Sequence, residues 1–453
     1  MIRPVHVLTP VLAACAVLGG CASYHAQPLS ERSTLAPSVA ALNRTRPGAL
    51  PISAESALTL ADVARLAVQN SPDLRAAREQ RGVAQAQVVQ AGLLPDPVLS
   101  GSYNLLLGGP GVANAIGASL TGDITALITL SARRRAAREA ARQVDASLVW
   151  QEWQTISRAQ TLVVDLVQQD RLLQSFRRTL ALLTDRASTT TRAVAQGNAT
   201  LQILAPDVAA VTGLQTQLEA AILAQEQRWQ SLDALLGLEP HVCPLLANDV
   251  SVPAIGRDEA AGMLAGLPQR RPDLIALQLG YRSQEANLRA AVLAQFPALT
   301  LGPNYGNDTS RVLSAGPSVS VALPLFNRNQ GVIAIQSATR DQLRAEYAAR
   351  LATASGGAQA LLANVDLLER QLAVSQAGLG QAERLASGAE RALRGGLLDE
   401  LSYVQLITAR LEKERQIIVL EQQLLEIRIA LATLLGAGLP PVQLTPPEES
   451  GPI

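Results

Sequence analysis

The chain repeats itself at a nearly constant interval, and this repeat limits the folds open to it. Pro72-Asp73-Leu74 recurs 200 residues later as Pro272-Asp273-Leu274. Leu235-Leu236-Gly237 recurs 199 residues later as Leu434-Leu435-Gly436. An offset held this closely over most of the chain indicates two tandem copies of one structural unit. Two copies are too few for a solenoid, so we expect them to lie side by side around a pseudo-axis.

Each copy begins with a stretch rich in Ala and Gln, at about residues 60–94 and 259–294. Apolar residues such as Ala84, Val88 and Ala91 recur at helical spacing. The Ser71-Pro72-Asp73 segment has the composition of a helix start, so the pattern predicts a kink or break near Pro72.

Two β-hairpins are predicted next, at residues 97–130 and 297–326. Residues 97–122 and 312–327 contain no charged side chain, and residues 318–323 alternate small or polar with apolar. The expected turns are Gly108–Gly111 and Gly306–Asp308. Strands of a soluble sheet usually carry charged residues on their wet face. An apolar face opposite a small, polar face instead indicates lipid on one side and water on the other.

Long helices follow the hairpins, at about residues 131–195 and 331–394, where no Pro occurs and charges are frequent. At 1.5 Å per residue, such helices are roughly 100 Å long, too long and too charged to cross a bilayer. Return helices are predicted at residues 201–236 and 397–435. The helical tips between them, Gly197-Asn198 and Gly395-Gly396-Leu397, are the residues to which we assign docking and gating.

These elements cannot form a closed structure from one chain. Four strands are too few to close a barrel, and an open sheet edge cannot face lipid because its backbone groups would lack partners. Long antiparallel helices with narrow apolar stripes also need neighbours on both sides. The fold predicted is therefore a mostly α-helical protein with membrane β-hairpins, in which several identical chains close a ring.

The ends of the chain indicate export and a lipid anchor. Residues 1–20 have the charged start and apolar stretch of a signal peptide, and Leu18-Gly19-Gly20-Cys21 matches the lipobox, in which Cys21 becomes diacylated. The Pro- and Ser-rich residues 21–58 are expected to form a tether. The remaining predicted segments are repeat 1 at 59–237, a linker at 238–258, repeat 2 at 259–437 and a tail at 438–453.

Composition gives no support to an enzyme, a cofactor site, a metal site or nucleic-acid binding. Lys and Arg number 38 and Asp and Glu also 38, so no excess of positive charge favours nucleic acid. After Cys21 the chain has one cysteine, Cys243, and two histidines, His25 and His241, which are too few for a disulfide framework, a metal site or a catalytic triad. A lipid-anchored helical scaffold is the alternative, but it does not explain two uncharged hairpins at matching places.

In this order, the motifs resemble those of the TolC-type outer membrane efflux proteins over nearly all of the mature chain. The resemblance rests on Asn70-Ser71-Pro72-Asp73-Leu74 and its second copy, and on the two Leu-Leu-Gly endings. Pro324–Gly331 also resembles the hairpin-to-helix junction of the family, most closely in the CzcC-type heavy-metal channels.

The resemblance implies a homotrimer in outer membrane lipid, with a twelve-stranded β-barrel and a periplasmic helical tunnel. It also implies a periplasmic adaptor and an inner membrane pump, of the resistance-nodulation-division class, as partners. Type I secretion uses the same kind of outer component and stays open as an alternative, as does the substrate.

Relatives of this type carry acidic residues six and nine positions after the second tip glycine. Counted from Gly396, these positions hold Ser402 and Gln405 here, while Asp399 and Glu400 lie nearby. The four residues are the candidates for the aperture, although the familiar acidic ring is absent.

Overall fold

A computed structural model describes residues 24–45, 52–53 and 55–444 of the chain. The chain divides into two units, Met1–Leu35 and Ala36–Ile453. In the first unit, residues 24–35 contain no helix or strand. The predicted signal peptide and Cys21 lie outside the described residues. All helices and strands of the described residues belong to the second unit.

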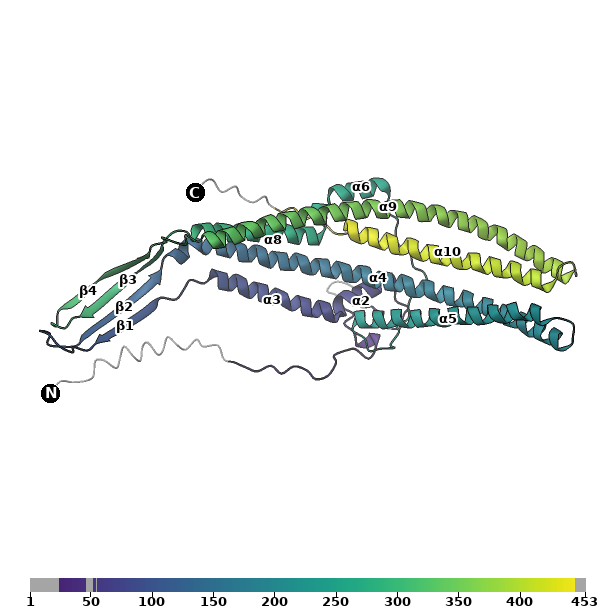
Figure 1. Cartoon of the computed structure of the whole chain (residues 1–453), viewed down its shortest axis with the longest axis horizontal. Helices are drawn as coiled ribbons and strands as arrows, with labels where there is room; N and C mark the ends of the chain where they lie inside the picture. The colour runs from purple at the N-terminus through teal and green to yellow at the C-terminus, as the bar shows by residue number, and fades with distance from the viewer. Residues whose placement is uncertain (1–23, 46–51, 54, 445–453) are drawn as a thin grey trace. The chain divides into compact units, whose positions relative to one another are not determined.

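Within the second unit, the two repeats have the same order of elements except at their start, where α6 and α7 of the second repeat stand in place of α2 of the first (Figure 1). A short 3-10 helix, η1, comes first at Val39–Ala41. The first repeat contains α2 (Leu60–Asn70), α3 (Pro72–Gly92), β1 (Val98–Asn104), β2 (Ala115–Asp123), α4 (Thr125–Ala195) and α5 (Leu201–Leu236). The second contains α6 (Arg257–Ala265), α7 (Leu267–Arg270), α8 (Pro272–Leu293), β3 (Ala298–Asn307), β4 (Leu313–Ala322), α9 (Gln330–Arg394) and α10 (Glu400–Leu435).

Local sequence signals set several helix ends. Thr59 and Asp62 form a reciprocal capping box that begins α2. Pro72 occupies the first turn of α3, where its missing N–H leaves no hydrogen bond unmade. Gly237 and Gly436 adopt positive φ angles of 70° and 65° and end the two return helices.

The helices form one layer, which includes the two long helices α4 and α9. Helix α4 packs against α3 and α5 and also against α8 and α10, while α9 packs against α8 and α10. Figure 1 shows α10 between α9 and α4, and α5 on the far side of α4. The order across the layer is therefore α3 with α5, then α4, then α8 with α10, then α9. Helix α9 and the α3 and α5 pair are its two free edges.

The four strands form one antiparallel sheet in the order β1-β2-β3-β4. The central pairing joins the two repeats, with Ser119 opposite Asn304 and Ala118 opposite Tyr305. On one face, the exposed side chains are large and apolar, including Leu99, Tyr103, Ile116, Leu120, Leu301, Val319 and Val321. The opposite face carries Ser100, Ser102, Asn104, Ser119, Asn304 and Ser320. The two faces thus have the chemistry that the sequence pattern predicted.

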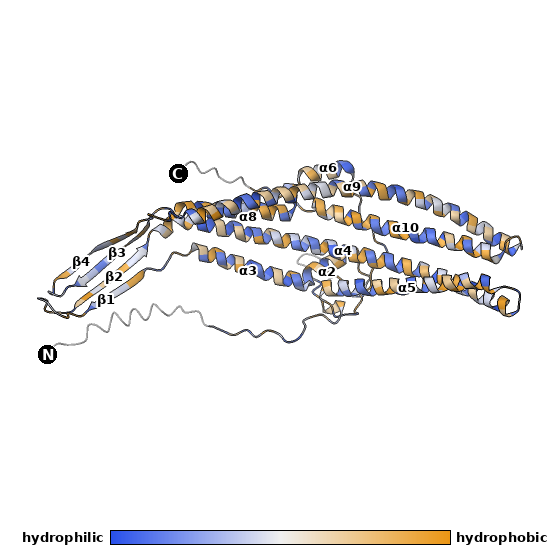
Figure 2. Cartoon of the chain, in the orientation of Figure 1, coloured by the Kyte–Doolittle hydropathy of each residue, from blue (hydrophilic) through white to orange (hydrophobic). Residues whose placement is uncertain are grey.

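Two apolar clusters fix the ends of the return helices. In repeat 1, Leu232 and Leu236 pack with Val63 and Leu66. In repeat 2, Leu431 and Leu435 pack with Leu267 and Leu274. Figure 2 shows hydrophilic and hydrophobic residues interspersed along the long helices. No helix in the described parts of the chain combines the length and apolar character of a membrane span.

The predicted tether is too long, because its second half belongs to the packed unit. Leu42, Ile52 and Leu58 are buried in the repeat 1 cluster. The Ala36 N–H also donates to the Gly237 carbonyl at 2.8 Å. These apolar residues stand singly in a segment that contains prolines and show neither helical nor strand periodicity. The sequence pattern therefore did not predict their packing.

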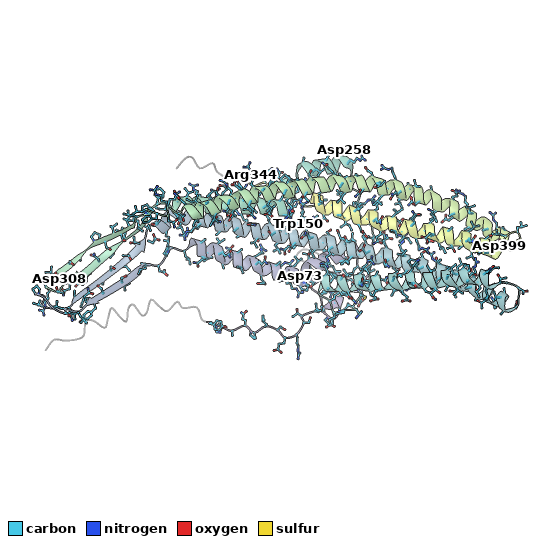
Figure 3. The ribbon with its side chains drawn as sticks, viewed as in Figure 1. Asp73, Trp150, Asp258, Asp308, Arg344 and Asp399 are labelled. Atoms are coloured by element: carbon cyan, nitrogen blue, oxygen red, sulfur yellow. The ribbon has the colours of Figure 1, made fainter. Side chains whose placement is uncertain are left out.

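Several predicted boundaries are also wrong. Helix α4 begins at Thr125, so the first hairpin ends near 123 and not at 130. Helix α6 begins at Arg257, two residues before the predicted start of repeat 2 at 259. The second turn lies at residues 308–312, later than Gly306–Asp308, because the Asp308 carboxylate accepts from the N–H groups of Ser310 and Val312. Asp308 lies at the strand end of the unit (Figure 3).

Candidate functional site

The two helical tips have the same backbone geometry. The Asn198 N–H donates to the Ala193 carbonyl, and the Leu397 N–H donates to the Ala392 carbonyl, each at 2.8 Å. The residue directly before each donor is a glycine with a positive φ, 76° at Gly197 and 69° at Gly396. These are the bonds and angles of a glycine-terminated helix end. The predicted tip residues therefore lie at two matching turns.

Gly395 does not share this requirement. Its φ is −84°, which any residue can adopt, so only Gly396 of the second tip needs the conformational freedom of glycine. At Gly197 and Gly396, an added Cβ would meet no atom within 4 Å. A larger residue there would meet backbone strain but no obstructing neighbour.

A buried ion pair joins the first tip to the second. The Arg186 Nε atom lies 2.8 Å from Asp207 Oδ1, with side chains 10% and 8% exposed. Asp207 also accepts from the Thr190 hydroxyl at 2.8 Å. Arg186 Nη1 donates to the Leu401 carbonyl on α10 at 3.4 Å. Arg186 thus connects α4, α5 and α10 close to both turns.

Sequence reasoning missed this ion pair, although the repeat contained a signal for it. The residues 199 positions later, Leu385 and Leu406, are apolar. A charged pair in one copy opposite an apolar pair in the other marks a place where the copies differ in their contacts.

The aperture candidates do not form an acidic cluster. Asp399 caps α10, with Oδ1 accepting from the Ser402 N–H at 2.9 Å and Oδ2 from its hydroxyl at 2.7 Å. These hydrogen bonds from Ser402 hold the pKa of the Asp399 carboxyl below its usual value. Gln405 is exposed, and the Glu400 side chain is outside the described parts. The structure brings Asp399 and Ser402 together as a helix cap.

Apolar side chains are exposed around the tips. Leu397 is 86% exposed and Leu201 is 71% exposed, and Ile203 and Leu401 are also exposed. Figure 3 places Asp399 at the end of the unit opposite Asp308. The tips therefore present apolar surface far from the sheet, of a kind that protein partners cover.

The α4 and α10 helices meet along a seam of polar contacts, here called the covered seam. Arg171 pairs with Glu421 at 2.6 Å and Arg178 with Glu414 at 2.5 Å. Toward the sheet, Trp153 Nε1 donates to the Thr433 carbonyl at 3.0 Å. These contacts fix the antiparallel register of the two helices.

One carboxyl in the covered seam is strongly perturbed. Burial, together with the hydrogen bond and charge of Glu426, raises the pKa of Asp165 to about 7. Gln422 Nε2 donates to both carboxyl groups, at 3.1 Å to Asp165 and 2.7 Å to Glu426. Arg228 of α5 lies 3.7 Å away from Asp165 and opposes the shift only in part.

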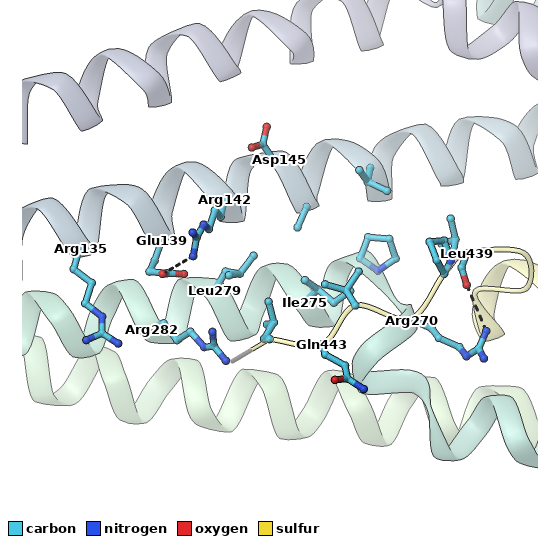
Figure 4. Close-up of a pocket in the computed structure, with 16 residues that line it drawn as sticks. Arg135, Glu139, Arg142, Asp145, Arg270, Ile275, Leu279, Arg282, Leu439 and Gln443 are labelled. Carbon is cyan, nitrogen blue, oxygen red and sulfur yellow. Dashed lines mark hydrogen bonds and ion pairs between the residues drawn. The ribbon is translucent and has the colours of Figure 1, made fainter. Parts of the chain in front are cut away.

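A cavity of about 750 Å³ lies where α4, α8 and the segment after α10 meet (Figure 4). Ile275 and Leu279 form part of its apolar wall. Its charged lining consists of Arg135, Arg142, Arg270, Arg282, Glu139 and Asp145. Glu139 pairs with Arg142 at 2.9 Å, within one helix. The cavity joins the two repeats and lies away from the tips.

Comparison with known proteins places these features in context. A family model described as outer membrane efflux protein matches residues 266–437. The pyoverdine export outer membrane protein OpmQ of Pseudomonas putida is 28% identical over 414 residues, covering 82% of this chain and 84% of that protein. OpmQ of Pseudomonas aeruginosa is 27% identical, with 94% and 96% covered. The crystal structure of the outer membrane protein VceC from Vibrio cholerae superposes with a TM-score of 0.68 at 17% identity, covering 84% of this chain and 96% of that one.

Proposed function

Because this chain belongs to the TolC-type outer membrane efflux proteins, we propose that three copies close into one channel through the outer membrane. The channel is the outer membrane component of an efflux system. The observation that carries the trimer is the sheet, which ends in unpaired edges at β1 and β4 and has one apolar face. Three copies of four strands would give a twelve-stranded barrel, which removes both edges.

The helical layer continues the channel into the periplasm, with the tips at its inner end. We assign the tips to docking of a periplasmic adaptor that connects the channel to an inner membrane pump of the resistance-nodulation-division class. The exposed Leu397 and Leu201 support this assignment, since apolar groups at a free end have no partner within the chain. Arg186 holds the two tips together, because it pairs with Asp207 of α5 and donates to the Leu401 carbonyl of α10.

The solute is proposed to be a small organic molecule. The support is the similarity to two pyoverdine export proteins over most of their lengths. Passage is passive, and the absence of catalytic activity stays a prediction. An efflux assay that supplies the chain with its pump and adaptor, and compares siderophores, dyes and divalent metals, distinguishes this substrate class from the heavy-metal alternative.

Assembly is tested by mass measurement of the purified protein in detergent. A mass of three chains plus bound detergent is expected, because open strand edges and free helix edges are all satisfied in a ring. A folded monomer with intact helix and strand content would contradict the channel assembly.

The tips are tested by Gly396→Trp and Gly197→Trp. Both should leave the trimer intact and abolish efflux, since an added side chain has room but distorts the turn. Leu397→Ala is the matched variant that removes apolar surface without changing the turn, and it should weaken crosslinking to the adaptor. Full efflux by the double tryptophan variant would rule out the docking and gating assignment.

Lipidation of Cys21 remains part of the proposal, on the strength of the Leu18-Gly19-Gly20-Cys21 sequence. Cys21→Ala should abolish labelling by a clickable palmitate analogue, while Cys243→Ser should leave labelling unchanged. Persistent labelling of Cys21→Ala would refute the anchor.

A further inference from the structure

We propose that the cavity between α4, α8 and the segment after α10 binds a small organic anion with an apolar body, and that Arg135 and Arg282 hold its anionic group. The cavity volume of about 750 Å³ lies in the range of small-molecule sites. The inference goes beyond the efflux role. It does not depend on the number of copies in the assembly, because the lining residues all belong to one chain.

Two helix faces that run side by side build the cavity. On both α4 and α8, the lining residues recur every three or four positions, so they form one stripe on each helix. The Ser283 hydroxyl of α8 donates to the Ala136 carbonyl of α4 at 2.9 Å. Arg282 and Arg135 directly precede these two bonded residues. Both guanidinium groups therefore lie at the same end of the cavity (Figure 4).

The segment after α10 closes the cavity on a third side. The Val442 N–H donates to the Gln269 carbonyl at 2.7 Å. Arg270 Nη1 donates to the Leu439 carbonyl at 3.4 Å. These two bonds hold the segment across the apolar wall, to which Leu439 itself contributes. The cavity is thus a built feature of the fold at the junction of the two repeats.

The two carboxylates in the lining already have arginine partners. Glu139 pairs with Arg142 at 2.9 Å. Asp145 pairs with Arg81 of α3 at 2.7 Å. Neither carboxylate therefore neutralises the other arginines of the lining.

Arg135 and Arg282 give the cavity its excess of positive charge. Among the described residues, neither side chain has an ion pair or a hydrogen bond. Arg135 is exposed and Arg282 is partly buried. Guanidinium groups bind carboxylate and phosphate oxygens through charge-assisted, often bidentate hydrogen bonds. Two such groups beside an apolar wall fit a ligand that has an anionic group at one end and an apolar body at the other.

The first repeat shows that the fold does not require these residues. At the positions 200 residues earlier, α3 carries Glu79 where α8 has Leu279, and Gly82 where α8 has Arg282. The duplicated helix therefore packs in the same place without an apolar wall and without this cation. The combination is specific to α8, as expected of a site and not of a packing requirement.

The polarity of the cavity distinguishes a dissolved molecule from a lipid of the bilayer. Arg135 lies ten residues after Thr125, the start of α4, which is about 15 Å along the helix from the sheet. Helix α8 runs toward β3, so Ile275 of the apolar wall is farther from the sheet than Arg282. A lipid in the membrane around the sheet would direct its chains toward the sheet and its headgroup away from it. The cavity has the opposite polarity, so its ligand enters from water.

The test measures binding of 1-anilinonaphthalene-8-sulfonate to the full-length protein in uncharged detergent. This probe is an apolar anion whose fluorescence rises when it leaves water for apolar surface. N-phenyl-1-naphthylamine has the same rings without the sulfonate and serves as the neutral probe. We expect the anionic probe to show saturable binding to a single class of site, above the background of detergent alone.

Arg135→Gln with Arg282→Gln removes both cations from the cavity. Binding of the anionic probe should weaken roughly tenfold or more, because charge-assisted hydrogen bonds are lost, whereas the signal of the neutral probe should not change. Arg138→Gln with Arg289→Gln is the matched control. It makes the same change in net charge on the same two helices, at exposed positions outside the cavity lining. This control should bind both probes as the natural chain does.

Weaker binding in the cavity variant alone supports the site. Equal affinity of the natural chain and the cavity variant for the anionic probe overturns it, as does an equal loss in the control. Dodecanoate should displace the probe, and inorganic phosphate should not. Equally strong displacement by phosphate would show a plain anion site and overturn the requirement for an apolar body.

A chain that ends at Leu444 tests the competing occupant, which is the acidic sequence that contains Glu448 and Glu449. Probe binding by this shortened chain and not by the full chain would assign the cavity to that sequence and overturn the proposal. The mass measurement described above is independent of this result. A folded monomer that still binds the probe would refute the trimer and leave the anion site standing.

Discussion

The covered seam and the free edges occupy equivalent positions in the two repeats but carry opposite chemistry. The covered seam holds two ion pairs and the Asp165–Glu426 carboxyl pair. The edges hold exposed leucines and valines at the matching places. A common backbone has thus been fitted with two kinds of contact.

The difference follows from how each seam forms. Helices α4 and α10 belong to one chain, so their encounter carries no cost of association, and polar pairs that contribute little net energy suffice to set register. Edges on separate chains must overcome lost translational and rotational freedom. Apolar burial, at roughly 25 cal/mol per Å², is the contribution that can offset this loss.

The largest effect is expected from a charge placed on the edge. Val374 of α9 is exposed at a free edge. In the proposed trimer, Val374→Lys would bury an unpaired ammonium wherever α9 of one copy meets the next copy, here called the edge seam, at a cost of about 3–5 kcal/mol per seam. We expect loss of the trimer, measured by mass in detergent. Gln376→Lys is the control, because Gln376 is exposed on the opposite face of α9. An intact trimer with Val374→Lys would place the edge seam elsewhere.

The next effect concerns the buried pair at the junction of α8 and α10. Arg271 lies 2.6 Å from Asp273, donates to the Leu434 carbonyl and lies over Trp150 of α4. Arg271→Ala leaves Asp273 buried with only the distant Arg350, so we expect the free energy of unfolding to fall by about 3 kcal/mol. Ser71→Ala, the matching change at the edge, should cost about 1 kcal/mol or less. Thermal and denaturant unfolding measure both losses. Equal losses of unfolding free energy for Arg271→Ala and Ser71→Ala would contradict this prediction.

The pH dependence of stability should come from the covered seam. The pKa of Asp165 is raised to about 7 in the folded protein, so the folded state binds a proton that the unfolded chain has already released above pH 4. The contribution of this carboxyl to stability is therefore largest at low pH and is lost as pH rises from about 4 through about 7, by on the order of 2 kcal/mol between pH 5 and 8.

Unfolding measured across this range should show the loss in the natural chain and not in Asp165→Asn. Asn364 and Gln227 are the residues 199 positions from Asp165 and Glu426 in the other repeat. Asn364→Asp with Gln227→Glu should add a second loss of the same sign, because it copies the carboxyl pair to the free edges. A pH profile unchanged by Asp165→Asn would assign the dependence to other groups.

The smallest expected effect is the difference in stability lost when the cap residue of α10 or that of α5 is replaced. Asp399 caps α10 through its side chain, whereas Thr200 makes no such bond at the start of α5. Asp399→Ala should destabilise the first turn of α10 more than Thr200→Ala destabilises the first turn of α5. Hydrogen exchange of the first turn of each helix measures the difference. Faster exchange after Thr200→Ala than after Asp399→Ala would contradict it.

The duplicated fold was predictable because its signals are local. The 200-residue offset, the uncharged hairpins and the tip glycines each appear in short stretches of sequence. The structure then gives strands Val98–Asn104 and Leu313–Ala322 and return helices that begin at Leu201 and Glu400.

The contacts of the site were not predictable, because they depend on which helix faces meet. Arg186 and Asp207 are separated by a tip turn, and their pairing follows only from the register of α4 and α5. Likewise, the sequence around Asp399 fits both an acidic residue at the aperture and a helix cap. The hydrogen bond from the Ser402 N–H to the Asp399 carboxylate identifies it as a cap. The burial of Leu42 and Ile52 depended on long-range packing that no periodicity announced.

The small, polar face of the sheet sets how the barrel treats passing solutes. Ser100, Ser102, Asn104, Ser119, Asn304 and Ser320 provide hydroxyl and amide groups, and Asp123 at the helix end is the one charged residue within the four strands. With this face turned inward, the barrel wall is wettable and uncharged except at Asp123, which shares the face of Ser119 at the helix end. Single-channel recordings should then find at most a weak preference for cations. Discrimination between cargoes is left to the parts of the pathway upstream of the barrel.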